Sequence, residues 1–284
     1  MEPFTLAPTT ATGPIGVLAQ SSSACAAQLL TIQAWASEHG LEVTDLGTSA
    51  DPNGVDAACQ LIIALGGDGT ILRALHVAMA HHLPVLGVNF GHVGFLADIR
   101  GDELDGALER LARGEALVDE RTALVAEIQG EPARRVIAFN DLVVARLAGF
   151  GAARLRVIVA GEVLLVLNGD GIVVASPTGS TAYTVGAGGP AVAPTLDAIV
   201  ITPLASQGTP LRSLVVDGSE TVVVQREPDS APVSLEIDGR EARAMPAPAT
   251  LEIRAAAGKA RLVRTRPRTF YRDLAHREQR DGAG

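Results

Sequence analysis

Lysine is almost absent from this sequence of 284 residues, in which Lys259 is the only one. A phosphate-binding P-loop and the active site of a protein kinase each require a lysine at a fixed place in a motif. Lys259 lies late in the chain and outside any GxxxxGK[ST] pattern. The sequence therefore excludes both of these nucleotide-binding classes.

Cysteine, long apolar runs and basic blocks are scarce as well. Cys25 and Cys59 are the only cysteines and form no CxxC pair, so we predict core positions rather than a disulfide or a zinc site. No apolar run is long enough to cross a bilayer, and no signal-peptide pattern opens the chain. The formal net charge is -9, without a basic block. These features predict a cytoplasmic protein that binds neither nucleic acid nor a membrane.

The spacing of apolar residues divides the chain near residue 118. Before it, apolar runs alternate with helix-like segments at 22–39, 70–80 and 102–113, which is typical of a parallel βαβ sheet. After it, short runs rich in β-branched residues follow one another. We predict an α/β plus all-β fold, with a Rossmann-like α/β domain over residues 1–118 and a β-sandwich domain over residues 119–262. Residues 263–284 form a polar tail.

The stretch LIIALGGDGTILRAL, residues 61–75, joins a buried strand to a helix through glycines. Phosphates bind at such a junction, because backbone N–H groups and the positive end of the helix meet there. Asp68 would repel a phosphate unless it binds a cation or accepts a proton. It could also simply cap a helix that begins at Thr70, so the motif alone leaves both roles open.

Two further stretches place polar groups where a core strand does not need them. The segment from Asn168 to Pro190 carries Asn168 and Asp170 two residues apart, on one side of a strand, and then a short helix that contains Tyr183. A connecting loop rich in glycine and serine is the alternative. Asn140 and Asp141 interrupt the apolar strand FNDLVVAR and must be hydrogen-bonded, although a satisfied bulge or strand end would also explain them.

Together these motifs resemble the NAD kinase family. The resemblance rests on GGDGT (66–70), GVNFGHVGFL (87–96), the Asn-Asp pair (140–141), DGIVVASPTGSTAY (170–183), GGP (188–190), LRSLVV (211–216) and IDG (237–239), in the family's order. Diacylglycerol kinases, sphingosine kinases and phosphofructokinases share segments like GGDGT. The PTGSTAY block distinguishes the NAD kinases from them.

The resemblance implies an N-terminal α/β domain, a C-terminal β-sandwich and a tail that packs back on the first domain. It also implies a homodimer or homotetramer that transfers a phosphoryl group from ATP, or in some members from polyphosphate, to the adenosine 2'-hydroxyl of NAD. A divalent cation such as Mg2+ is required. NAD and ATP are then the expected partners, and the active site is expected to use residues of both domains.

The matching positions imply a role for each residue. Asp68 would accept the proton of the hydroxyl, and Gly66, Gly67 and Gly69 would admit the donor phosphates. The adenosine would be held by Asn140 and Asp141, and the rest of the dinucleotide by Asp170 and the helix start between Thr181 and Gly186. The nucleotide-binding residues that complete the set are Thr70, Arg73, Phe95, Asn168, Ala182, Tyr183 and Ala205. No protein ligand is assigned to the metal.

The sequence departs from the family pattern at three positions. Gly186 stands where the family often has serine, Ser176 where it has threonine, and Val93 where it has leucine. The first removes a hydroxyl from the dinucleotide site.

A lipid kinase would share GGDGT but would need a membrane-facing element, which this acidic chain lacks. A non-catalytic dinucleotide-binding protein would keep the glycines but would not need Asp68.

Overall fold

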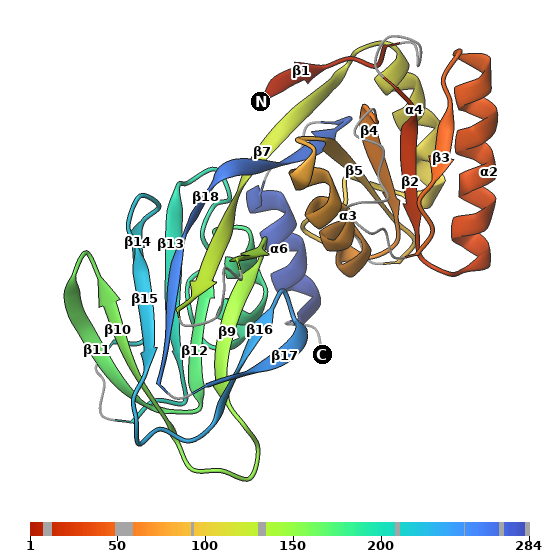
Figure 1. Ribbon diagram of the computed structural model, residues 1–284. Coiled ribbons are helices and arrows are strands. Elements are labelled where there is room, and N and C mark those ends of the chain that lie inside the picture. The colour runs from red at the N-terminus through yellow and green to blue at the C-terminus, as the bar shows by residue number, and fades with distance from the viewer. Residues whose placement is uncertain are drawn as a thin grey trace. The chain divides into compact units, whose positions relative to one another are not determined.

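The computed structural model describes residues 1–7, 13–48, 59–91, 94–129, 135–207, 211–246, 248–266 and 270–281. The chain forms two compact units (Figure 1). The α/β unit contains residues 1–121 and 260–284, and the all-β unit contains residues 122–259. The chain passes between them within two long strands, β7 (Ala116–Ile128) and β18 (Ala249–Arg264).

A parallel sheet forms the centre of the α/β unit. Its strands follow the order β6, β5, β4, β2, β3. Their bounds are β2 (Ile15–Ala19), β3 (Val43–Asp45), β4 (Leu61–Leu65), β5 (Pro84–Asn89) and β6 (Ile99–Arg100). The short β1 (Glu2–Phe4) pairs antiparallel with the start of β7, and the end of β18 pairs parallel with β5. The predicted parallel sheet is therefore present.

Helices cover both faces of this sheet (Figure 1). On one face α2 (Ser23–Glu38) and α4 (Leu104–Ala112), the latter preceded by the 3-10 turn Gly101–Glu103, share a core with the sheet that includes Trp35. On the other face lies α3 (Asp68–Ala80). It approaches so closely that a Cβ on Gly87 of β5 would come within 3.0 Å of the Ile71 side chain. The last helix is α6 (Phe270–Asp281).

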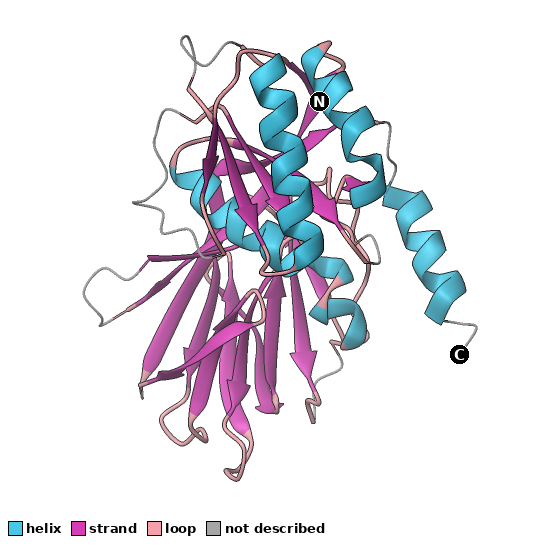
Figure 2. Cartoon of the chain, turned by 90° about the vertical axis from the view of Figure 1, so that its right-hand side faces the viewer, coloured by secondary structure: helices cyan, strands magenta, loops and turns pink. Residues whose placement is uncertain are grey.

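The all-β unit contains antiparallel strands with short helical turns between them (Figure 2). One sheet has the order β14, β13, β12, β9, β16, β17, and the other strands include the run β11, β10, β15, β18, with β8 beside β7. Bounds are β8 (Arg135–Ala138), β9 (Asp141–Arg146), β10 (Ala153–Val159), β11 (Glu162–Gly169), β12 (Gly171–Ala175), β13 (Ala198–Leu204), β14 (Leu214–Asp217), β15 (Val222–Arg226), β16 (Val233–Ile237) and β17 (Arg240–Met245). Side chains of both sets of strands form one core cluster.

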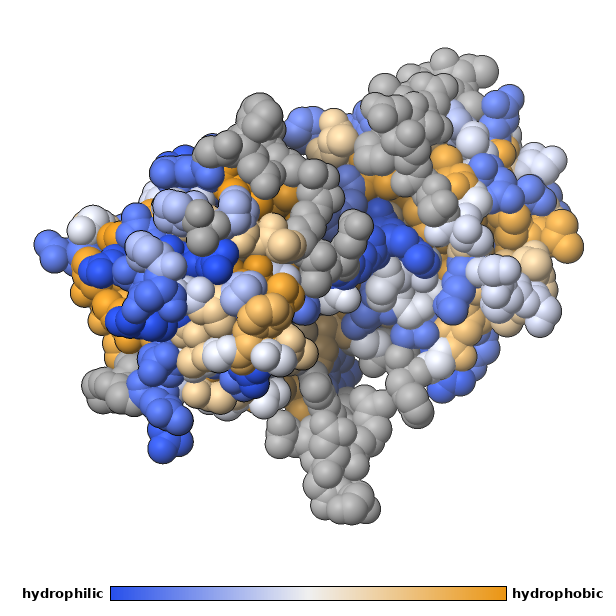
Figure 3. Space-filling view, turned by 60° about the horizontal axis from the view of Figure 1, so that its bottom comes forward, coloured by the Kyte–Doolittle hydropathy of each residue, from blue (hydrophilic) through white to orange (hydrophobic). Residues whose placement is uncertain are grey.

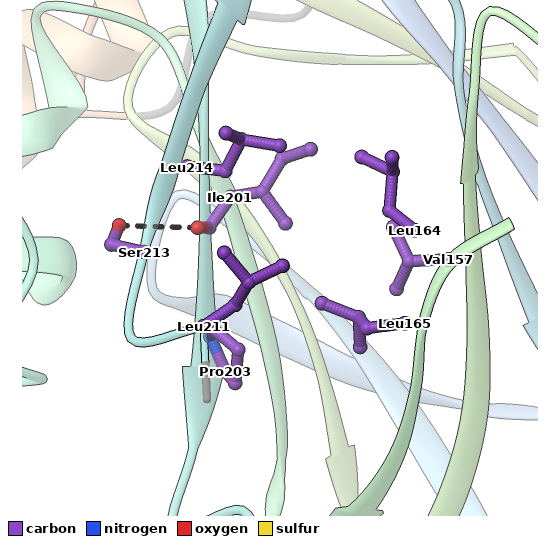
Figure 4. A pocket seen from close by; sticks show the side chains of 8 residues that line it. All are labelled: Val157, Leu164, Leu165, Ile201, Pro203, Leu211, Ser213 and Leu214. Atoms are coloured by element: carbon purple, nitrogen blue, oxygen red, sulfur yellow. Dashed lines mark hydrogen bonds between the residues drawn. The ribbon is translucent and has the colours of Figure 1, made fainter. Parts of the chain in front are cut away.

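A small apolar cavity interrupts that core between strands of the two sets (Figure 4). Leu165, Ile201 and Leu214 are among the residues that line it, and the nearby Ser213 hydroxyl donates to the carbonyl of Ile201 at 3.1 Å. Its volume is about 10 Å³, which is the room of a single water molecule. This cavity is a packing gap and cannot hold a nucleotide.

Three elements differ from the sequence prediction. The run expected as one strand around FNDLVVAR is two strands, β8 and β9, separated by Phe139 and Asn140. The run around NGDGIVVAS is likewise divided at Asp170 into β11 and β12. Finally, the tail contains α6, which we did not predict, because its sequence is too polar to show an apolar stripe. The predicted domain limits at 118 and 262 stay predictions.

A lipid kinase would need an apolar element, in a helix or on the surface, that faces the membrane. Within the described ranges, none of the helices is both long enough and apolar enough to cross a membrane. On the face drawn in Figure 3, hydrophobic residues are scattered among hydrophilic ones.

Candidate active site

Asp68 lies at the junction of β4 and α3, as the first residue of the helix. The N-cap residue is Gly67, so the alternative in which Asp68 caps a helix that begins at Thr70 is wrong. The Asp68 carboxylate instead accepts a hydrogen bond from the backbone N–H of Phe95, at 3.2 Å. A loop 27 residues further along the chain therefore orients this side chain.

Glycines around Asp68 have two distinct functions. Gly66 has a φ of +154° and a Cβ there would come within 3.0 Å of the Thr70 side chain, so the turn requires glycine. Gly94 has no room for a Cβ either, because the Asp68 carboxylate occupies that place. Gly67 and Gly69 have open space where a Cβ would stand. Their backbones are therefore accessible to another molecule.

Arg73 and Phe95 complete the surroundings of Asp68 within the α/β unit. Arg73 is half-buried on α3, and its guanidinium donates to the Thr70 hydroxyl at 3.0 Å. Phe95 is half-buried, and its ring lies 6.3 Å from that of Phe270 on α6. His92 and Val93, which follow in the GVNFGHVGFL motif, lie outside the described residues.

A second group of predicted residues meets at one end of β12 in the all-β unit. Asp141 begins β9 and pairs with Ala175, the last residue of β12. The backbone carbonyl of Asn140, just before it, accepts from the N–H of Ser176 at 2.9 Å. A Cβ on Gly179 would come within 3.0 Å of the Asn140 backbone. The PTGSTAY segment therefore packs directly on the Asn-Asp pair, and Asn140 stands at a strand end, which was the structural alternative for this position.

The PTGSTAY segment is held by its own hydroxyl groups. It contains a 3-10 turn (Gly179–Thr181), then Ala182, then the short helix α5 (Tyr183–Gly186). The buried Ser180 hydroxyl donates to the Pro177 carbonyl at 2.7 Å, and that of Thr181 donates to the Thr178 carbonyl at 3.2 Å. The Tyr183 side chain is 47% exposed. It is therefore available to a ligand, whereas the hydroxyls of Ser180 and Thr181 are engaged in the turn.

The Asp141 carboxyl group is electrostatically unusual. Burial raises its pKa from 3.8 to about 7, the negative charges of Asp238 and Glu236 contribute in the same direction, and an N–H donated by Tyr183 opposes them. The side chain of Asp141 is thus poised to gain or lose a proton near neutral pH. Its hydrogen bond with Tyr183 also ties the two predicted residues together.

Three further predicted residues of the all-β unit line a separate cavity of about 330 Å³. Asn168, Asp170 and Ala205 lie on its wall, and Asp170 forms an ion pair with Arg146. This cavity is at the opposite end of β12 from Asp141, since Gly171 begins the strand and Ala175 ends it. From Asp170 to Ala175, the residue that pairs with Asp141, there are five steps along the chain. Five steps along a strand correspond to roughly 16 Å. Asp170 and Asp141 are therefore not neighbours within this unit. Gly186, another predicted residue, has open space where a Cβ would stand.

Sequence reasoning missed three residues that organise these places. Ser176 donates its hydroxyl to the Phe139 carbonyl at 2.6 Å, although the sequence marked it only as a departure from threonine. Arg146 was the unremarked end of an apolar run. Asp238 accepts three backbone N–H groups from residues 139–141. Its signal was present, as the acidic residue of the IDG motif, but nothing in the sequence gave it a role.

A divalent cation has few protein ligands to choose from. Among the described residues, no group of three or more His, Cys, Asp and Glu side chains could hold a metal ion. Mg2+ commonly keeps several waters and binds through one or two carboxylates together with substrate phosphates. Of the residues described at this turn, Asp68 offers one carboxylate beside the open glycine backbone.

Comparison with known proteins assigns the chain. Residues 23–116 match the ATP-NAD kinase N-terminal domain, and residues 139–265 match the ATP-NAD kinase C-terminal domain. An NAD kinase of Heliobacterium modesticaldum is 35% identical over 241 residues, which are 84% of this chain and 85% of that protein. The chain belongs to the ATP-NAD kinase family. An NAD kinase of Moorella thermoacetica is 38% identical over 75% of this chain and 69% of its own length.

Solved structures of this kinase family share the fold. A crystal structure of yeast NADH kinase complexed with NADH has a TM-score of 0.80 at 21% identity, covering 97% of this chain and 87% of that one. An NAD kinase from Archaeoglobus fulgidus in complex with ATP has a TM-score of 0.74 at 23% identity, covering 94% and 98%. These likenesses support the arrangement of a mixed α/β unit followed by antiparallel sheets.

Proposed function

We propose that this member of the ATP-NAD kinase family transfers the γ-phosphoryl group of ATP to the 2'-hydroxyl of the adenosine ribose of NAD, forming NADP and ADP. The observation that carries the proposal is the place of Asp68. Its carboxylate stands at the carboxyl end of a parallel strand, is oriented by the Phe95 N–H and borders open glycine backbone. Ligands of open α/β sheets collect at this edge.

In the proposed reaction Asp68 acts as the general base. The 2'-oxygen forms a bond to the γ-phosphorus while the bond from that phosphorus to the bridging oxygen breaks, and ADP leaves with the electron pair. The proton of the hydroxyl passes to Asp68. A carboxylate fixed by a backbone hydrogen bond is suited to receive it, because a base contributes only when it is positioned.

The donor phosphates need positive charge that no nearby lysine supplies. The N–H groups of the glycine turn and the N-terminus of α3 provide part of it. Arg73 adds a full charge on the same helix. A bound cation such as Mg2+ would offset further charge on the phosphates. Thr70 anchors this arrangement through its hydrogen bond with Arg73.

The all-β unit supplies the proposed binding site for NAD. Asn140 and Asp141 hold the adenosine, and the ionised Asp141 carboxylate accepts hydrogen bonds from sugar hydroxyls. Ala182 and the exposed ring of Tyr183 lie at the same end of β12. Asn168, Asp170 and Ala205 would contact the nicotinamide half, and Phe95 would lie near the adenine. The yeast relative was solved with NADH, so NADH is a second candidate acceptor.

Finer features of the fold and assembly belong to the same proposal. Strand order and helices on both faces support a Rossmann-like α/β unit. The shared core cluster supports a β-sandwich for the second unit. A homodimer or homotetramer and a cytoplasmic location stay predictions from the family resemblance and the sequence.

The test is to incubate the purified chain with NAD, ATP and Mg2+ and to quantify NADP by a dehydrogenase specific for it. We expect NADP formation that stops in excess chelator and returns with added Mg2+. Parallel reactions replace ATP by polyphosphate, NAD by NADH, and NAD by diacylglycerol or sphingosine. Phosphorylation of a lipid without NADP would favour the lipid kinase, and NAD binding without any turnover would favour a non-catalytic binding protein.

A further inference from the structure

Asp238 and Gly239 form the two-residue turn of the β16–β17 hairpin. Both residues have positive φ, +51° and +66°, and the strands pair at Ile237 and Arg240 on either side. These are the features of a type I′ turn, in which Asp-Gly and Asn-Gly are favoured. A turn alone would explain the sequence, but it would leave the side chain of Asp238 in solvent.

The Asp238 side chain is instead buried, with 7% exposure, and reaches a distant part of the chain. Its Oδ1 accepts from the N–H groups of Asn140 at 2.7 Å, Phe139 at 3.0 Å and Asp141 at 3.2 Å. In the reverse direction the N–H of Asp238 donates to the carbonyl of Asp141 at 2.9 Å. One carboxylate thus accepts three consecutive N–H groups, at the turn between β8 and β9 and at the first residue of β9.

Placing the Asp238 carboxylate beside Asp141 costs electrostatic free energy, which suggests that the position of residues 139–141 is important. Asp141 and Asp238 are both carboxylates, both are buried, and their charges repel each other. An uncharged residue in place of Asp238 could close the β16–β17 hairpin without bringing a second negative charge to Asp141. The three charge-assisted hydrogen bonds offset that repulsion and fix the backbone from which Asn140 and Asp141 project.

We propose that Asp238 is a positioning residue for the acceptor, whose carboxylate holds the Asn140–Asp141 turn in the conformation that binds NAD. The inference rests on the proposed function of this site. Asp238 acts through the backbone of its neighbours and does not itself contact the substrate.

The same geometry couples Asp238 to the ionisation of Asp141. The groups that face the Asp141 carboxyl are Asp238, Glu236 of β16 and the N–H of Tyr183. Removing the charge of Asp238 removes one of the causes that raise the pKa of Asp141 to about 7. The pH at which Asp141 ionises therefore moves down, and with it the pH above which NAD binds well.

Asp238→Asn is the informative variant. Asn-Gly suits a type I′ turn as well as Asp-Gly does, but the amide carries no charge and turns one acceptor oxygen into a donor. We expect KM for NAD to rise roughly tenfold at pH 7, since hydrogen bonds to a charged group are among the stronger ones, with KM for ATP unchanged. The midpoint of the pH dependence of KM for NAD should move below that of the unchanged chain. Asp238→Gly, which keeps the turn and has no acceptor, should show the larger KM effect.

Asp217→Asn is the matched control. Asp217 also accepts hydrogen bonds at a turn, from the N–H and hydroxyl of Ser219, but it is an exposed residue at the end of β14. Asn140→Ala is the comparator for a direct acceptor contact, and should weaken NAD more than ATP. Thermal unfolding of each variant shows whether the turn still folds.

Three outcomes would count against the proposals, and they are distinguishable. An unchanged chain that makes no NADP from NAD defeats the proposed function, and the affinity of NAD measured by calorimetry then still compares Asp238→Asn with Asp217→Asn. If the unchanged chain is active while Asp238→Asn matches Asp217→Asn in KM for NAD and in pH midpoint, Asp238 is only a turn residue. An equal rise in KM for both NAD and ATP would also overturn the positioning role.

Discussion

At the scale of single residues, the orientation of Asp68 decides between chemistry and structure. The carboxylate is directed to the N–H of Phe95, and Gly67 rather than Asp68 occupies the N-cap. An acidic residue in the first turn is favourable to α3 through the helix dipole, by about 0.3–1 kcal/mol. This helix-dipole effect would not require the carboxylate to point at the loop. Gly94, however, leaves the space there that the carboxylate occupies.

Asp68→Asn is expected to keep the fold and most of the affinity for NAD. The amide matches the carboxylate in shape and can still accept from Phe95, but it cannot take the proton of the hydroxyl. We expect turnover to fall by about a hundred- to ten-thousand-fold. Steady-state rates of NADP formation and the affinity of NAD, measured by calorimetry, check this. Turnover like that of the unchanged chain would reduce Asp68 to a structural residue.

Sequence reasoning at this scale found residues whose chemistry is visible in a motif. Asp68 stood out because a carboxylate lies in a glycine turn typical of phosphate sites, and Asn140 and Asp141 stood out because they interrupt an apolar run. The raised pKa of Asp141 could not be predicted, because its causes are burial and a carboxylate 97 residues further along the chain. No feature of the sequence near Asp141 indicates that Asp238 lies beside it.

At the scale of elements, the loop that precedes β6 determines the geometry around α3. Gly94 packs against the Asp68 carboxylate, and Phe95 donates the hydrogen bond to it. The ring of Phe95 lies near that of Phe270 on α6. One short segment therefore connects the catalytic carboxylate of the proposed reaction to the last helix.

Gly94→Ala tests this packing. The new Cβ would stand where the carboxylate is, so either Asp68 rotates away or the loop shifts. Overpacking of this kind costs about 1–3 kcal/mol of stability, and we expect turnover to fall at least about tenfold, since a misplaced base contributes little. Gly106→Ala in α4, where a Cβ has open space, is the control and should keep full activity. Normal turnover in Gly94→Ala, with Asp68 intact, would contradict the account of the loop.

Elements were predictable from sequence where burial is uniform. β2, β4 and β5 are buried almost throughout and read as continuous apolar runs. β3 and α6 escaped because each is short of buried apolar residues, so their pairing and packing depend on the rest of the fold. The break between β8 and β9 escaped because the hydrogen bonds that stabilise it come from Asp238.

At the scale of the whole molecule, the proposed chemistry requires residues from both units. Asp68 and the glycine turn belong to the α/β unit, and Asn140 and Asp141 belong to the all-β unit. Family membership, rather than the geometry of either unit alone, connects the two sets.

A fragment of residues 119–284, expressed separately, should therefore retain weak NAD binding at most and no kinase activity, because it lacks Asp68. Calorimetry with NAD and the NADP assay measure the two properties, with the full chain as control. Phosphorylation of NAD by the fragment alone would disprove the requirement for both units.

The two crossings of the chain, within β7 and β18, have a consequence for synthesis on the ribosome. The strand segment that pairs with β5, Arg261 and Leu262, emerges only after all of residues 122–259 have been made. The inserted all-β unit is thus completed first, while the earlier α/β segment still waits for its final strand and for α6. The unit whose synthesis begins first is therefore completed last, unlike successive domains, which usually fold from the N-terminus onward.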